Sequence, residues 1–419
     1  MRFLRDGYYQ QPSIEAMRSG VYYPGFLWFQ NAAASARSGS DLLLAWVAGV
    51  VGRNPFFVFM PVILALHGVF ACSAAALAAA FLDRRVLLAA VILMAIAPLN
   101  LYAVHQQLIA QVAGLGLMCA LGALTLVAPQ EFDNNGRIAL IAVVAAAYLM
   151  TYPETVVIFG IALVFYHARH AADAGLKWKS FRRLLMAPVL ACILLGPYSV
   201  GCLFFLLSQI HQSATQGIYD GTSLFPYFLV PNGVAALFGI SRLGELPVEP
   251  WLSLSIVMGL SLLAITCVAM VVELARGRPV SCYLAATCVV TAVVTAQQNN
   301  FGLFKAALFS QAFIWFVLVA ALSRAGTRLS AAAYLAVLAM IGFTDFKYVQ
   351  AAVADDVGSA SFMAHASQDH LLTKLLQHPP GDQCGADFAS PNPPLIKLLA
   401  ARIDCAKSFV ARPSTFSTP

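Results

Sequence analysis

The sequence predicts an all-α polytopic membrane protein, and three observations support this fold class. Hydrophobic residues make up 60% of the 419 residues, charged residues only 11%, and the mean hydropathy is +0.77. Long apolar stretches alternate with short polar loops, and about 20 apolar residues let a helix cross a bilayer while it satisfies its own backbone. The basic residues fall almost entirely in every second loop. This composition excludes an ordinary soluble globular domain.

Ten membrane spans are predicted from the hydropathy pattern. They cover residues 56–82, 86–104, 107–128, 138–152, 155–168, 184–208, 251–275, 280–297, 303–323 and 328–343. The loops after the odd-numbered spans hold Arg84, Arg85, Arg137, Arg169, Lys177, Lys179, Arg182, Arg183, Arg276, Arg278, Arg324 and Arg328. Because positive loops stay in the cytoplasm, we expect these loops inside. The other loops, including the long connection 209–250, are then outside.

A single helix across 138–168 is an alternative to two short spans in that region. It would place the basic cluster 177–183 outside, against the positive-inside rule. Pro153 also favours a break, because proline interrupts the helical hydrogen-bond ladder. We therefore predict two helices joined by the outer turn Thr151-Tyr152-Pro153-Glu154.

Three regions follow from this map. Residues 1–55 form an outer segment with interfacial helices, 56–343 a transmembrane bundle of about ten helices, and 344–419 an outer, periplasmic C-terminal lobe. The first region contains arginines and no signal peptide, which suggests that a preceding transmembrane helix is missing; a genuine outward N-terminus is the alternative. Within it, Ser40-Asp41 is expected to cap an interfacial helix over 42–48.

The cysteines fit the same map. Seven of the nine lie in predicted spans, where a thiol acts as a small apolar group. The other two, Cys384 and Cys405, lie in the C-terminal lobe. In an oxidising periplasm they would form a disulfide; two free thiols are the alternative. No Cys or His spacing indicates a zinc site.

Polar residues concentrate in the outer connections. Within the predicted spans His67 is the only ionisable residue far from an end, and we expect it to hydrogen-bond between helices. Ion-coupled transporters usually keep relay groups at this depth, so their scarcity counts against such a carrier. The short outer connections contribute His105, Gln106, Gln107, Tyr152, Glu154, Asn300 and Lys305. This combination suggests an outer cavity that holds a sugar and a phosphate beside a lipid tail.

The segment Leu4-Arg5-Asp6-Gly7-Tyr8-Tyr9, the Tyr23-Pro24-Gly25 turn and the bundle with short outer hairpins carry a resemblance to a family. The chain resembles the lipid-dependent integral-membrane glycosyltransferases of the GT-C superfamily, most of all the bacterial arabinose- or mannosyl-transferase-like proteins. The likeness is architectural and covers most of the chain. It implies that Asp6 is the catalytic base and that Lys305 in Asn300-Phe301-Gly302-Leu303-Phe304-Lys305 meets a lipid-linked phosphate.

We therefore expect a hexosyl- or pentosyltransferase of the bacterial inner membrane. It would move a sugar from a polyprenyl-phosphate carrier to a cell-envelope glycan or lipid on the outer face, with both tails periplasmic. Glu154 is the second choice for the base, because transfer needs a proton acceptor near the acceptor hydroxyl. Substrate-binding roles are expected for Lys305, His105, Gln106, Gln107, Tyr152 and Asn300.

Two other functions stay open. A glycan polymerase or ligase would use the same donors and a similar cavity, whereas a lipid or glycan flippase or other transporter would need an enclosed polar path. The lipid bilayer is an expected partner and nucleic acid is not. No metal ligands are assigned, because the sequence has no Asp-Asp or Asp-x-Asp pair at the site, and whether a divalent metal assists is left open.

Overall fold

The computed structural model describes most of the chain from Ser38 to Gln368 and two short strands beyond. The described residues are 38–53, 55–79, 81–105, 108–127, 132, 134–174, 182–215, 233–241, 247–297, 299–324, 327–368, 386–389 and 409–412. Residues Ala36–Tyr348 form one unit, called the bundle below, and residues 1–35 with 349–419 form a second. In the second unit, β1 (Ala386–Ala389) pairs in parallel with β2 (Phe409–Arg412).

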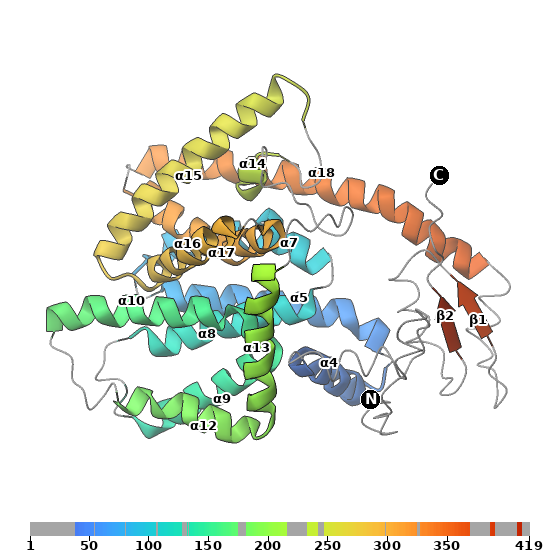
Figure 1. Ribbon diagram of the computed structural model, residues 1–419. Coiled ribbons are helices and arrows are strands. Elements are labelled where there is room, and N and C mark those ends of the chain that lie inside the picture. The colour runs from blue at the N-terminus through green and yellow to red at the C-terminus, as the bar shows by residue number, and fades with distance from the viewer. Residues whose placement is uncertain are drawn as a thin grey trace. The chain divides into compact units, whose positions relative to one another are not determined.

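The bundle is helical throughout its described part (Figure 1). Its helices are α4 Ser38–Val51, α5 Pro55–Ala78, α6 Arg84–Ala95, α7 Pro98–His105, α8 Ile109–Thr125, α9 Asn135–Thr151, α10 Val156–Ala174, α12 Met186–Leu195, α13 Tyr198–Thr215, α14 Gly233–Leu237, α15 Trp251–Ala275, α16 Pro279–Ala296, α17 Asn300–Leu322 and α18 Thr327–Gln368. A 3₁₀ turn, η2 (Pro153–Thr155), joins α9 to α10.

Five unbroken segments of the described chain are long and apolar enough to cross a membrane. They are Val58–Ala78, Trp251–Ala275, Pro279–Ala296, Gly302–Leu322 and Ser330–Gln350. Three bent helix pairs raise the number to eight if each pair is one span. Large apolar side chains such as Leu64, Phe204 and Val268 are exposed on the outside of the bundle, as lipid contact requires. The chain is an integral, polytopic, helical membrane protein, as predicted.

Two of the predicted spans are each formed by two helices that meet at a bend. Residues 86–104 are two helices, α6 and α7, bent by 47°, and residues 184–208 are α12 and α13, bent by 108°. The second bend occurs at Gly196-Pro197: Gly196 has a φ of 57°, which glycine adopts readily, and Pro197 lacks the N–H that would continue α12. The break at Pro153 is confirmed, since α9 and α10 meet at 115°.

The last predicted span also differs from the structure. Residues 328–343 are part of α18, which continues to Gln368. The apolar segment of this helix extends to Gln350, so Asp345 lies inside it. The expectation that His67 is the only ionisable residue deep in a span is therefore wrong. His67 itself hydrogen-bonds through Nε2 to the carbonyl of Ala95, 2.8 Å away, and joins α5 to α6 as predicted.

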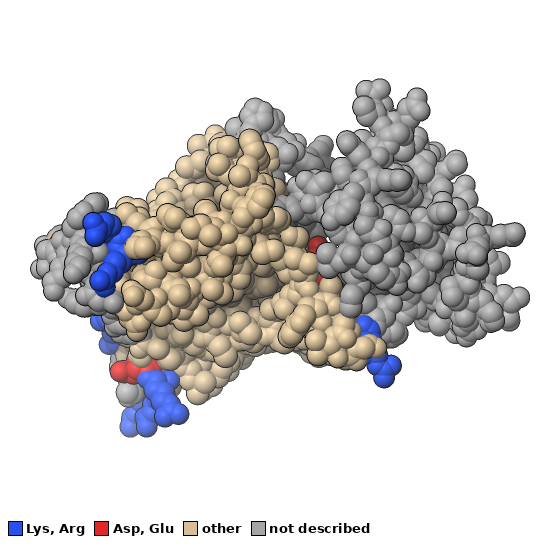
Figure 2. Space-filling model, turned by 90° about the horizontal axis from the view of Figure 1, so that it is seen from below, with Lys and Arg blue, Asp and Glu red and all other residues tan. Residues whose placement is uncertain are grey.

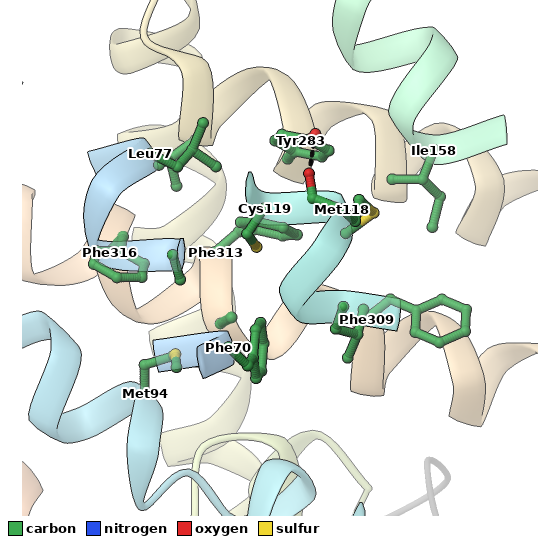
Figure 3. Close-up of a cluster of buried hydrophobic side chains, with 14 of the residues drawn as sticks. Phe70, Leu77, Met94, Met118, Cys119, Ile158, Tyr283, Phe309, Phe313 and Phe316 are labelled. Atoms are coloured by element: carbon green, nitrogen blue, oxygen red, sulfur yellow. Dashed lines mark hydrogen bonds between the residues drawn. The ribbon is translucent and has the colours of Figure 1, made fainter. Parts of the chain in front are cut away.

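Helix α17 lies at the centre of the bundle, and all of its residues from Leu308 to Ala320 are buried. Figure 3 shows part of the apolar core around it. The ring of Tyr283 on α16 stacks on Phe313 of α17, with centroids 4.9 Å apart, and its hydroxyl donates to the carbonyl of Met118 at 3.0 Å. A Cβ on Gly122 would lie 2.6 Å from the Tyr283 hydroxyl, so α8 needs glycine there. These contacts hold α8, α16 and α17 together.

A glutamine stabilises the break between α6 and α7 deep in the bundle. The N–H groups of Leu99 and Asn100 begin α7 and have no partner within that helix. Both donate to Oε1 of Gln311 on α17, at 2.8 and 3.1 Å, and Nε2 of Gln311 donates to the carbonyl of Leu237 at 2.8 Å. Residues 233–241 thus reach the depth of Gln311, which corrects their placement in a wholly outer loop.

The basic connections meet at one end of the bundle. Arg169 donates from Nε to the carbonyl of Ala275 at 3.0 Å, and the guanidinium of Arg278 lies 5.7 Å from the ring centroid of Phe81. Figure 2 shows a face on which Lys and Arg gather mainly toward one end, beside a broad uncharged surface. These contacts bring together basic connections that follow three of the predicted spans, and the alternation of all ten spans stays a prediction. That the basic end faces the cytoplasm stays a prediction.

A buried carboxylate holds two of the basic connections together at this end of the bundle. Glu273, near the end of α15, accepts hydrogen bonds from Arg276, at 3.1 Å, and from Arg324 beyond α17. Its role is structural, because it bridges two guanidinium groups that belong to different connections.

The start of α4 lies beside the turn between α9 and α10. A Cβ on Gly39 would lie 2.7 Å from Oγ1 of Thr151, and the hydroxyl of Ser38 donates to that of Tyr198 at 2.8 Å. The helix predicted over 42–48 is present but begins at Ser38. Ser40 is therefore inside the helix and is not its cap.

Candidate functional site

Two residues predicted to serve catalysis and binding, from connections far apart in sequence, meet in the bundle. Nζ of Lys305 lies 3.4 Å from Oε1 of Glu154, and the exposed fractions of the two side chains are 21% and 9%. Helix α17 runs from Asn300 beside this pair to Leu322 beside the basic end, so the pair lies at the opposite end. Two charges so far removed from water depend on each other for stability.

The turn that carries Glu154 is fixed by its neighbours. Pro153 occupies the first position of η2, where the missing N–H costs nothing. Thr155 is fully buried, and its hydroxyl shares a 2.7 Å hydrogen bond with that of Tyr148, one turn before the end of α9. The polar turn is therefore held in one conformation, with Glu154 between two anchored residues.

Tyr152 packs this turn against two helices. It is buried, and its ring makes an edge contact with Phe309 of α17, with centroids 5.8 Å apart. On the other side, a Cβ on Gly114 of α8 would lie 2.1 Å from Cβ of Tyr152, so only glycine permits this approach. These contacts give the ring a packing role, and the expected part of Tyr152 in substrate binding stays a prediction.

Lys305 is positioned by the cap of α17. The side-chain oxygen of Asn299 accepts from the N–H of Gly302 at 2.8 Å, which is a typical N-cap. Lys305 follows in the second turn, on the same face as Phe309. The cap thus fixes the depth at which the ammonium group meets Glu154.

His105 reaches the same end of the bundle through a row of aromatic rings. It ends α7 and makes an edge contact with Tyr348 of α18, with centroids 5.9 Å apart. Tyr348 contacts Tyr102 at 6.4 Å, and Tyr102 contacts Phe304 at 5.6 Å. Phe304 directly precedes Lys305, so this row of rings links His105 to the turn of α17 that carries Lys305.

The structure adds Gln111, which the sequence analysis missed. Gln111 lies one turn before Gly114 on α8, and Lys305 lies one turn before Phe309 on α17. Both helices start at this end, and Gly114 and Phe309 both contact Tyr152. Gln111 is therefore at the depth of Lys305. It is 5% exposed, and its Nε2 has no hydrogen-bond partner among the described residues.

The arrangement offers complementary chemistry. Lys305 and the amide of Gln111 are donors for a phosphate or hydroxyl oxygen, and Glu154 is a proton acceptor. Among the described residues, no group of three or more His, Cys, Asp or Glu side chains is placed to hold a metal ion.

The remaining predicted site residues are not placed. Asp6, Gln106, Gln107, Cys384 and Cys405 lie outside the described residues, and the side chain of Asn300 does too. The base and the disulfide assigned to them stay predictions. The seven cysteines of the predicted spans are free thiols.

No family model matches the chain, and neither a curated protein nor a solved structure matches it. The GT-C resemblance therefore stays an expectation drawn from the sequence.

Proposed function

We propose that this protein is a membrane glycosyltransferase that moves a sugar from a polyprenyl-phosphate carrier to a cell-envelope glycan or lipid. The observation that carries the proposal is the ion pair of Glu154 and Lys305, opposite the basic end and largely shielded from water. Transfer from a lipid phosphate needs a base for the acceptor hydroxyl and a cation for the departing phosphate. This pair holds both groups within one site.

In the proposed reaction, the acceptor oxygen bonds to the anomeric carbon while the bond from that carbon to the phosphate oxygen breaks. The phosphate leaves with the electron pair, and a carboxylate takes the proton of the acceptor hydroxyl. Asp6 is the first candidate for that carboxylate by resemblance, and Glu154 is the second. Lys305 would exchange Glu154 for the phosphate, with Gln111 as an additional donor.

Binding of the carrier tests the proposal. A polyprenyl phosphate should bind the purified full chain in lipid nanodiscs, and Lys305→Ala should weaken binding by about 10- to 100-fold, the range for a hydrogen bond to a charged group. Lys347→Ala is the matched control, because Lys347 is exposed and its Nζ lies over the ring of Phe343 at 5.8 Å. Equal losses in both variants, or no binding to wild type, would contradict the proposal.

A second candidate function, a lipid or glycan flippase or other transporter, is favoured by a different observation. Non-helical backbone at residues 238–241 lies deep among the spans, near Gln311. Transporters use such interrupted segments around their binding sites. Movement of a lipid-linked glycan across a liposome membrane without any acceptor would support this function over the transferase.

A further inference from the structure

In the last span, a buried carboxylate has no hydrogen-bond partner among the residues that the structure describes. Asp345 on α18 is 7% exposed, and its Oδ2 has no hydrogen bond among the described residues. Lys347, two residues further along α18, forms no ion pair with Asp345 in the described structure, because its side chain is exposed and lies over the ring of Phe343. Ionisable groups inside a membrane are costly and mark functional sites.

A second buried polar group lies in the segment 233–241, next to α18. Ile341 of α18 packs on Gly239, where a Cβ would lie 2.9 Å from its Cγ1, and Thr344 donates from its hydroxyl to the carbonyl of Gly239 at 2.8 Å. Ser241 follows two residues after Gly239. It is 5% exposed, and its Oγ also has no partner among the described residues. Asp345 directly follows the donor of this hydrogen bond, and Ser241 comes two residues after its acceptor.

We propose that Asp345 and Ser241 form part of a binding site for a small monovalent cation such as Na⁺. A carboxylate and a hydroxyl are oxygen donors, the ligand type that hard cations prefer. One carboxylate offsets one positive charge, which favours a monovalent ion. The adjacent backbone 238–241 is not helical, and transporters coordinate cations with carbonyls of such interrupted segments. The inference rests on neither candidate function above.

Thermal unfolding of the purified full chain in detergent tests the site. At constant ionic strength, replacing choline chloride with NaCl should raise Tm with saturation, because a ligand that binds only the folded state stabilises it. Asp345→Asn should abolish this rise, and Ser241→Ala should shift it to higher sodium concentrations. Asp83→Asn is the matched control, since Asp83 is exposed in the loop before α6 and should leave the sodium response unchanged.

If Asp345→Asn does not fold, direct binding of radioactive sodium to the wild type and to Ser241→Ala at fixed temperature tests the site. Wild type should then bind sodium, displaced by lithium or sodium but not by choline, and Ser241→Ala should bind it more weakly. The proposal is overturned if sodium stabilises no more than choline, if Asp345→Asn keeps the full response, or if wild type binds no sodium.

Discussion

The pair of Glu154 and Lys305 joins connections that lie 151 residues apart. Removing one partner of a shielded pair leaves an uncompensated charge, so a loss of activity alone would not separate catalysis from stability. Separating them requires two measurements, of donor affinity and of turnover, on the same variant.

Glu154→Gln is expected to lower turnover while the affinity for the lipid-phosphate donor stays equal or increases. Glutamine cannot take the acceptor proton, and it competes with phosphate for Lys305 less strongly than a carboxylate does. Binding and single-turnover rates in nanodiscs check this. Glu273→Gln, a buried carboxylate at the basic end, is the control for general instability.

A parallel loss of donor affinity would instead assign Glu154 a structural role. Asp6→Asn separates the two candidate bases. If the resemblance to GT-C enzymes holds for Asp6, this variant loses turnover and Glu154→Gln retains most of it.

At the level of single residues, the sequence predicted two members of the candidate site. Glu154 and Lys305 were placed at one membrane level because both flank short outer connections. Gln111 and Asp345 were not predicted. One glutamine within an apolar helix changes the hydropathy little, and Asp345 comes two residues after the predicted end of its span. Hydropathy gives the depth of a residue along a helix but not the direction of its side chain.

Among the elements, a break in a helix leaves backbone N–H groups inside the bundle that need a partner from elsewhere. Where α6 gives way to α7, the chain exposes N–H groups that lipid cannot satisfy. Gln311 satisfies them from a neighbouring helix, so the break depends on a side chain more than 200 residues away.

Gln311→Leu should reduce the free energy of unfolding by at least about 2 kcal/mol, because two N–H groups and one carbonyl lose their partner in a dry environment. Denaturant unfolding in detergent measures the change. Ser310→Ala is the matched control, since the Ser310 hydroxyl bonds only the carbonyl of Ala307 in its own helix, at 2.9 Å. Equal effects of the two substitutions would contradict the role given to Gln311.

The sequence predicted helix positions better than helix directions. The break at Pro153 was expected, because proline there separates two short apolar runs. The break at Gly196-Pro197 was not, because the apolar stretch 184–208 continues through it. A backbone turn that depends on local φ angles and on tertiary hydrogen bonds leaves the hydropathy unchanged.

For the whole molecule, charge and hydropathy point to the same arrangement. The basic connections gather at one end, and the Glu154–Lys305 pair lies at the other. Positive charge is retained in the cytoplasm during insertion, so the end with Glu154 and Lys305 should face outward. The orientation is the part of the fold that contacts within the chain cannot determine, because they are the same in either direction.

Two single-cysteine variants of a chain whose nine native cysteines are replaced by alanine or serine test this orientation. Asp83→Cys lies at the basic end, and Glu249→Cys lies just before α15, whose other end joins the basic connections; both positions are exposed. A membrane-impermeant maleimide added to intact spheroplasts should label Glu249→Cys only, and lysis should expose Asp83→Cys. The opposite pattern would invert the protein and place the candidate site on the cytoplasmic face, where the donor would have to be presented from inside. Labelling of both variants in intact spheroplasts would show that the two ends do not lie on opposite sides of the membrane.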